Sequence, residues 1–152
     1  MSIIALEGAR FYAYHGYYEE EQVVGNEYIL DVFVDTPTRS AADEDDLFDE
    51  ESKDALTVNY EMLYQICRIE MREPAKLLET VVQRIVDRID DQFDNVRGIR
   101  VKLRKCFPPL GGRVESSSVE INTGVFGFPT VATLTALKKF AKDLDELDDE
   151  ED

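Results

Sequence analysis

The sequence predicts an α+β fold, because the period of its apolar residues changes along the chain and then changes back. Apolar and polar residues alternate at 27–35 and at 99–105, which is typical of strands with one buried face. Between these stretches, at 59–93, apolar residues recur every three or four positions, which indicates amphipathic helices. The predicted order is β–β–α–α–β–β, with an antiparallel sheet and both helices on one face.

The first strand pair is predicted at residues 3–14 and 27–35, which a short polar stretch separates. Residues 3–14 are rich in β-branched and aromatic side chains. In the second segment, Asp31 and Asp35 lie on one face, and Pro37 ends the strand. The opposite, apolar face is formed by Tyr28, Leu30, Val32 and Val34. A strand–turn–strand pair of this length predicts an antiparallel hairpin.

Two helices and a second strand pair are predicted after it. The first helix runs from Asn59 to about Met71, and the second begins at Pro74, because proline is tolerated in the first turn of a helix. The apolar stripe of the second helix consists of Leu78, Val81, Val82, Ile85, Val86, Ile89 and Phe93. Strands follow at 99–105 and around 119–121. Four strands leave two sheet edges unpaired, so we expect a homo-oligomer whose subunits pair edge to edge and close the sheet into a barrel.

The net charge of −16 is concentrated in two segments. Residues 41–54 carry eight acids and one lysine, a net of −7, and residues 138–152 carry eight acids and three lysines, a net of −5. We expect one domain at 1–124, with an acidic, solvated insertion at 39–56. The tail at 125–152 is predicted to form an amphipathic helix with an acidic end. We expect this helix to pack on its own barrel in preference to a foreign partner.

Several functional classes are excluded by composition. The chain has no basic stripe for nucleic acid, no apolar run of about 18 residues for a membrane span, and no signal-peptide pattern at its N-terminus. Cys67 and Cys106 lack CxxC spacing, so we interpret them as reduced thiols of a cytoplasmic protein. His15 is the only histidine, which excludes a multi-histidine zinc site and leaves a serine–histidine–aspartate triad unsupported.

Two charged residues interrupt apolar patterns and are candidates for chemistry. Counting by two from Ile99 places Lys105 on the apolar face of its strand, where burial lowers the pKa of a lysine toward neutrality. The alternative is a frayed strand end whose ammonium reaches water. Glu79 lies in the first turns of the second helix, near its apolar stripe. It either complements the helix dipole or offers two coplanar acceptors to a flat heterocycle.

Tyr60 and Glu21 carry weaker signals. Tyr60 opens the first helix, where a tyrosine usually packs against its neighbours. Glu21 is the last of three consecutive glutamates in a loop, and such acids usually face solvent. From the residues alone, we predict a small oligomeric α+β domain with a polar cluster of these two residues, Glu79 and Lys105.

Five short motifs, in their order and spacing, resemble the dihydroneopterin aldolase family. They are LEGARFYAYHG near the N-terminus, EEEQVVGN in the first loop, TVNY before the first helix, LLE at the head of the second and KCFPP after the third strand. The resemblance covers residues 2–123. It implies the tunnelling fold, with the same order of strands and helices, in tetrameric or octameric barrels whose sites are shared between neighbouring subunits.

The substrate that the resemblance implies is the pterin 7,8-dihydroneopterin. A retro-aldol reaction of folate biosynthesis cleaves it to 6-hydroxymethyl-7,8-dihydropterin and glycolaldehyde. By resemblance, Glu79 binds the 2-amino and ring N–H groups, and Leu78 and Val58 line the same pocket. The pterin ring takes up the electrons, so the resemblance implies no cofactor, no metal and no Schiff base.

The implied catalytic residues are Lys105, Glu21 and Tyr60. Lys105 acts as an acid and base near N5 of the pterin, Glu21 orders water beside it, and Tyr60 comes from the neighbouring subunit to move a proton. Two alternatives stay open. One is epimerisation of dihydroneopterin or its triphosphate, for which Arg104 and Arg113 are candidate phosphate contacts. The other is a non-catalytic pterin-binding or scaffold module.

Overall fold

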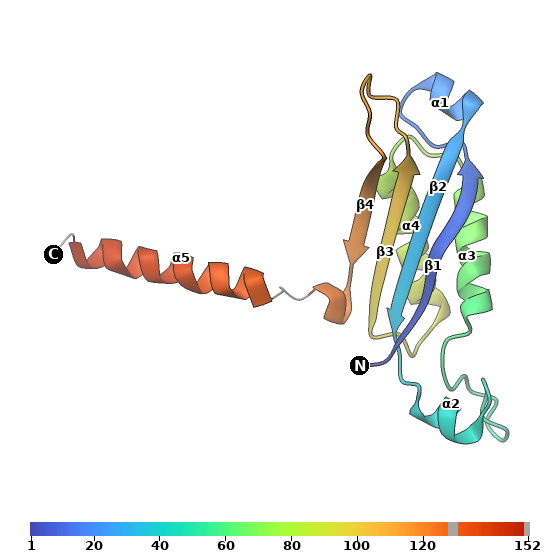
Figure 1. The fold of residues 1–152 in the computed structure, drawn as a ribbon. Coiled ribbons are helices and arrows are strands. Elements are labelled where there is room, and N and C mark those ends of the chain that lie inside the picture. Colours follow the sequence, from blue (N-terminus) through green and yellow to red (C-terminus); the bar gives the residue numbers. More distant parts are fainter. Residues whose placement is uncertain (128–130, 151–152) are drawn as a thin grey trace.

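The computed structural model describes residues 1–127 and 131–150. Its centre is a four-stranded antiparallel sheet in the order β1-β2-β3-β4. The strands are β1 (Ile3–Ala13), β2 (Asn26–Asp35), β3 (Gly98–Cys106) and β4 (Ser116–Asn122). Two helices, α3 (Tyr60–Arg72) and α4 (Leu78–Gln92), cover one face of the sheet (Figure 1). The predicted α+β class and the order β–β–α–α–β–β of the main elements are confirmed.

The core lies between the sheet and the helix pair. Alternate residues of the two central strands are buried there, and the register sets Leu30 opposite Leu103 and Val32 opposite Val101. The helices contribute the expected apolar stripes, which include Leu63, Ile66 and Met71 from α3 and Val81, Val82, Ile85, Val86 and Ile89 from α4. Burying one such side chain stabilises the fold by about 1.5–3 kcal/mol. This alternation therefore fixes which face of β3, including its last residues, points toward the helices.

Helix α4 begins at Leu78, so the prediction that Pro74 opens this helix is wrong. The link between α3 and α4 is not helical, because its backbone groups bond elsewhere. The Ala75 N–H donates to Nδ1 of His15 (3.2 Å), and the Ala75 carbonyl accepts from the N–H of Gly16 (2.9 Å). The helix link is thereby fixed to the segment that follows β1.

Two short helices occupy segments predicted as loops. Helix α1 (Glu19–Val24) follows β1, and Gly25, at φ 74°, leads the chain into β2. Helix α2 (Arg39–Glu44) opens the acidic insertion, which folds back through a bridge between Phe48 and Ala55. The insertion lies at the end of the sheet where α3 begins (Figure 1), and most of its side chains are exposed.

The chain continues after β4 in two elements. The 3-10 turn η1 (Gly124–Gly127) lies against β3, and Gly124 has a φ of 56°. A Cβ at Gly124 would lie 2.0 Å from the carbonyl oxygen of Arg97, so only glycine fits there. Helix α5 (Val131–Glu150) stands away from the sheet in Figure 1. The tail thus contains a helix, and its packing on an assembled barrel stays a prediction.

Strands β1 and β4 form the two edges of the sheet, and within the described residues each pairs on one side only. The register of β1 shifts between Leu6 and Ala9, where Gly8, at φ 72°, donates its N–H to a carboxylate oxygen of Asp31 (2.7 Å). Closure of these edges into a barrel remains a prediction. Across residues 1–127 and 131–150, no helix has the length and apolar character to cross a membrane.

Candidate active site

Lys105 and Glu21 form a largely buried ion pair at one end of the sheet. Lys105 is the penultimate residue of β3 and lies on its buried face, where only 7% of the residue is exposed. Its Nζ donates to Oε1 of Glu21 at 2.5 Å. This hydrogen bond holds the pKa of Glu21 below its ordinary value, against the opposing effect of burial and with help from the Tyr18 N–H. The site therefore contains an ionised carboxylate next to an amine with little access to water.

Glu21 reaches Lys105 because α1 turns its side chain inward. Its second oxygen, Oε2, accepts from the N–H of Tyr18 at the start of α1 (3.1 Å). Gly16 leaves room for this approach, since a Cβ there would lie 2.4 Å from Cβ of Glu21. The solvent-facing interpretation of Glu21 is therefore wrong, whereas the two glutamates before it are exposed.

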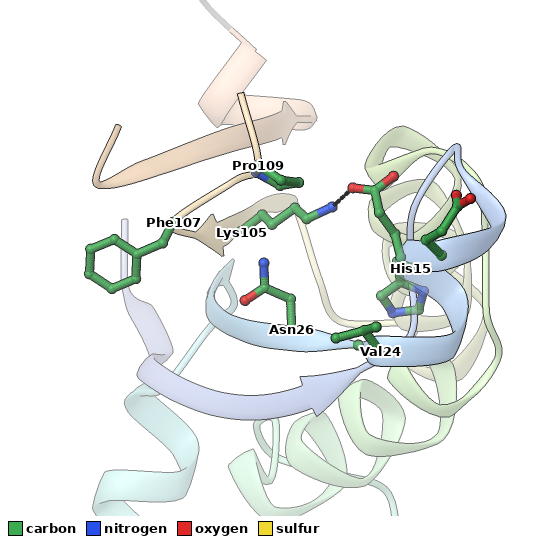
Figure 2. A pocket seen from close by; sticks show the side chains of 9 residues that line it. His15, Val24, Asn26, Lys105, Phe107 and Pro109 are labelled. Atoms are coloured by element: carbon green, nitrogen blue, oxygen red, sulfur yellow. Dashed lines mark hydrogen bonds and ion pairs between the residues drawn. The ribbon is translucent and has the colours of Figure 1, made fainter. Parts of the chain in front are cut away.

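Lys105 and Glu21 stand between two cavities. The first, of about 360 Å³, brings them together with Leu78 and Glu79 from the start of α4. The second, of about 330 Å³, is lined by His15, Val24, Asn26, Phe107 and Pro109. Figure 2 shows this second cavity, with the Lys105 side chain extended toward the carboxylate. A ligand in either cavity can therefore contact the same amine.

Glu79 lies in the first turn of α4, on the rim of the first cavity, where its side chain is exposed. A carboxylate offers two acceptors in one plane, which suits a flat ligand with neighbouring N–H groups. Lys105, at the wall of the same cavity, offers a proton donor to another part of that ligand. The arrangement can therefore bind a flat heterocycle at one side and exchange a proton with it at the other.

Tyr60 and Val58 lie far from this cluster. Tyr60 is the first residue of α3, while the C-terminal end of that helix lies next to His15. Thirteen helical residues separate the two ends by about 18 Å. The Tyr60 side chain is 59% exposed, and Val58 is buried in the core at the same end. One chain thus brings together Glu21, Glu79 and Lys105 but not Tyr60.

His15 belongs to this region, although the sequence pattern gave it no role beyond excluding a zinc site. Its ring packs edge-on against Tyr28 (73°, 5.3 Å between centroids), and its Nδ1 accepts from Ala75. Its Nε2 has no hydrogen-bond partner among the described residues. Burial and the positive charge of Arg84 lower the pKa of His15 to about 4. A neutral imidazole therefore holds the helix link, and with it the start of α4, against the end of β1.

Phe107 is a second residue that the sequence pattern did not indicate. It lines the second cavity, is 74% exposed and adopts a φ of 45°, which is unfavourable for a bulky side chain. Its N–H donates to the carbonyl of Glu115 (2.8 Å), which ties the β3–β4 loop together. Residues held in such conformations gather at functional sites. The only sign of this unusual backbone in the sequence is the pair of prolines, Pro108 and Pro109, that follows Phe107.

The fold and the site together define a small α+β protein in which two cavities share a buried lysine–glutamate pair. A family model described as FolB, dihydroneopterin aldolase, matches residues 4–122. The dihydroneopterin aldolase of Bacillus subtilis (strain 168) is 34% identical over 122 residues, which are 80% of this chain and 96% of that protein. The chain therefore belongs to the dihydroneopterin aldolase family.

Two solved structures share the fold of the body. Dihydroneopterin aldolase of E. coli in complex with neopterin has a TM-score of 0.69 at 21% identity, and the match covers 82% of this chain and 100% of that one. Dihydroneopterin aldolase of Burkholderia thailendensis bound to guanine has a TM-score of 0.58 at 19% identity, over 81% and 90% of the two chains. Helix α5 lies beyond the residues that the family model matches.

Proposed function

We propose that the protein cleaves 7,8-dihydroneopterin by a retro-aldol reaction, giving 6-hydroxymethyl-7,8-dihydropterin and glycolaldehyde. The observation that carries the proposal is the Lys105–Glu21 pair at the wall of a cavity whose rim holds Glu79. Membership of the family supports it. So do the ligands of the two structural relatives, neopterin and guanine, because both are flat heterocycles with an amino group beside a ring N–H.

The substrate binds through its pyrimidine edge. The Glu79 carboxylate accepts from the 2-amino group and the neighbouring ring N–H, in two roughly parallel charge-assisted hydrogen bonds. Leu78, at the start of α4, lines the same cavity and offers backbone and apolar contacts beside them. These contacts orient the ring so that N5 and the side chain at C6 face Lys105.

Lys105 supplies the proton chemistry. Protonation of N5 makes the C6=N5 bond an electron acceptor, and loss of the C2′ hydroxyl proton then breaks the C1′–C2′ bond and releases glycolaldehyde. The bonding electrons form an enamine in the pterin, which takes a proton at C1′ and returns the N5 proton to give the product. Glu21 holds the amine in place and can order a water beside it. Atoms and electrons balance without an added co-reactant.

Tyr60 completes the site from a neighbouring chain in this proposal. An exposed tyrosine at the far end of α3 supports this, because one chain cannot bring it to Lys105. Edge pairing of β1 and β4 in a tetrameric ring, single or stacked as an octamer, would place one chain's Tyr60 end beside the next chain's Lys105 end. Val58, before that tyrosine, would help to shape the shared pocket. We further infer a cytoplasmic enzyme, in keeping with the two free thiols of Cys67 and Cys106.

The test is glycolaldehyde release from dihydroneopterin by the purified protein. Lys105→Ala should lower kcat by about 10²–10⁴-fold, the usual contribution of a general acid–base group. Lys102→Ala is the matched control, because Lys102 lies on the other face of the same strand and does not line the cavity. The proposal fails if wild-type protein binds the pterin without releasing glycolaldehyde, or if Lys105→Ala keeps full turnover.

The phosphorylated substrate of the epimerase alternative has less support from the structure. Arg104, one of the two candidate phosphate contacts, is paired with Asp31 instead (2.9 Å). Arg113 remains in the β3–β4 loop and lines a separate surface depression. Comparing the rates on dihydroneopterin and its triphosphate distinguishes these functions, and we expect the free pterin to be the better substrate.

A further inference from the structure

Helix α5 exposes an apolar stripe that the proposed active site does not use. The stripe consists of Leu134, Leu137, Phe140, Leu144 and Leu147, each between 45% and 62% exposed. Their spacing of three or four residues places them along one side of the helix. Most helices in proteins gain their stability by packing an apolar face against a neighbour. Nothing within the described residues covers the stripe, so it is available to a partner.

The four leucines of the stripe have the same spacing in both directions along the helix. About a midpoint between Phe140 and Ala141, Leu137 corresponds to Leu144, and Leu134 corresponds to Leu147. An antiparallel second copy of α5 would therefore present an apolar residue to each apolar residue of the first. Self-complementarity of this kind is what a two-fold contact between identical chains requires, and a contact with a different protein does not require it.

The charges of the tail select the antiparallel direction. Residues 131–142 carry three lysines and no acid, whereas residues 143–152 carry eight acids and no lysine or arginine. Antiparallel pairing keeps the two acidic ends apart and sets each of them beside the half of the partner helix that has no acid. Parallel pairing brings two strongly acidic ends together and is opposed by their repulsion. The intrahelical ion pair of Lys142 and Glu146 (3.5 Å) lies away from the stripe and is compatible with the contact.

We propose that α5 pairs antiparallel with α5 of a second copy of this chain, through the apolar stripe. This contact lies outside the family-matched body and adds to any pairing of sheet edges. The turn η1 precedes the tail and packs beside β3, next to the edge strand β4. The helix pair would therefore link two copies of the domain near their β4 edges. The proposal does not depend on which reaction the body catalyses.

Disulfide trapping in the full chain tests both the partner and the direction. In the double variant Leu134→Cys/Leu147→Cys, antiparallel helices place each new thiol near the other one of the partner. The two positions are about 20 Å apart along one helix, so they cannot bond within a chain. We expect disulfide-linked dimers under mild oxidation from the double variant, and few from either single variant. Wild type is the control, since its two cysteines are buried.

Each other outcome overturns the proposal. Efficient dimers from both single variants would indicate parallel pairing. No dimer from any variant, with the new thiols accessible to a labelling reagent, would mean that no second copy covers the stripe. A foreign partner or the chain's own body would then be the occupant.

The mass of the assembly gives an independent measurement. Leu137→Glu/Leu144→Glu should weaken association through the tail by on the order of 100-fold or more, because both copies lose two buried leucines. Lys139→Gln/Lys142→Gln changes the net charge by the same −2 on the opposite side of the helix and should leave the mass distribution unchanged. Glycolaldehyde release per chain should stay at the wild-type level in both variants. Equal masses for all three proteins at every concentration would contradict the proposal.

Discussion

The two ends of the sheet differ in how many candidate site residues each one holds. One end holds Lys105, Glu21 and Glu79 around shared cavities, and buried hydrogen bonds tie three connecting segments together. The other end holds the start of α3, whose first residue Tyr60 is exposed, and the acidic insertion lies next to it (Figure 1). The first end therefore contains three of the four candidate polar site residues, and the second end contains only Tyr60.

The difference indicates that one chain carries the candidate site residues at two separate places. A helix of fixed length separates Tyr60 from Lys105, so no side-chain movement within one chain can join them. If both act on one substrate, they come from different copies. In the proposed ring, each copy would contribute Tyr60 to a site shared with one neighbour and Lys105 to a site shared with the other. Every site would then contain the same residues.

The largest expected effect concerns Glu79, the proposed substrate contact at the end of the sheet that holds Lys105. Glu79→Gln replaces one of two coplanar acceptors by a donor and removes the charge, so kcat/KM should fall by about 10³-fold, or about 4 kcal/mol. Steady-state kinetics of glycolaldehyde release measure this. Asp90→Asn, on an exposed turn of the same helix, should change kcat/KM less than about 2-fold. Equal, small effects of both changes would remove Glu79 from the site.

The next effect tests whether the two ends meet between chains. Tyr60→Phe should lower kcat by about 10²-fold, because it removes a proton-transfer group. Mixing Tyr60→Phe and Lys105→Ala subunits should restore about a quarter of wild-type activity. With random mixing, about one interface in four joins an intact Tyr60 to an intact Lys105. Native mass spectrometry would first establish that subunits exchange. Mixed assemblies with no recovered activity would show that the two residues do not share a site across chains.

A smaller effect tests the fixed geometry of the Lys105 end. His15 has its pKa lowered from 6.5 to about 4 in the fold, so the unfolded chain binds the extra proton first as pH falls. The contribution of His15 to the free energy of unfolding is therefore fully present above about pH 6.5 and is lost toward pH 4. The free energy of unfolding should fall by about 2 kcal/mol between pH 7.5 and pH 5. Urea unfolding at these two pH values measures the loss. Because His15 is the only histidine, His15→Phe should abolish most of this slope. An unchanged slope in the variant would assign the loss to other groups.

The smallest effect concerns the insertion beside Tyr60. Glu50→Gln/Glu51→Gln removes two exposed charges from a segment where acids crowd one another. Stability should change by less than about 0.5 kcal/mol and kcat by less than about 2-fold, as is usual for exposed surface positions. A larger loss of kcat would make the insertion part of the Tyr60 end of the site.

The sequence pattern located the strands and the main helices because burial of alternate or helically spaced residues leaves a periodic signal. It placed Lys105 on the buried face for the same reason, since parity along β3 is fixed by Ile99, Val101 and Leu103. It failed at the start of α4, where proline favours a helix opening but the Ala75 backbone bonds to His15 and Gly16 instead. Those bonds join residues 59 and 60 positions apart, and no local pattern records them.

What the sequence determined by itself was therefore the architecture, the buried face of the strands and main helices, and a family resemblance carried by short motifs in order. What only the tertiary structure decided was which of these residues meet. The pairing of Glu21 with Lys105 spans 84 positions and depends on the short helix α1, on space left by Gly16, and on the register of β2 with β3. Periodicity describes one segment against the core, whereas a site depends on the distances between segments, and those are set by packing.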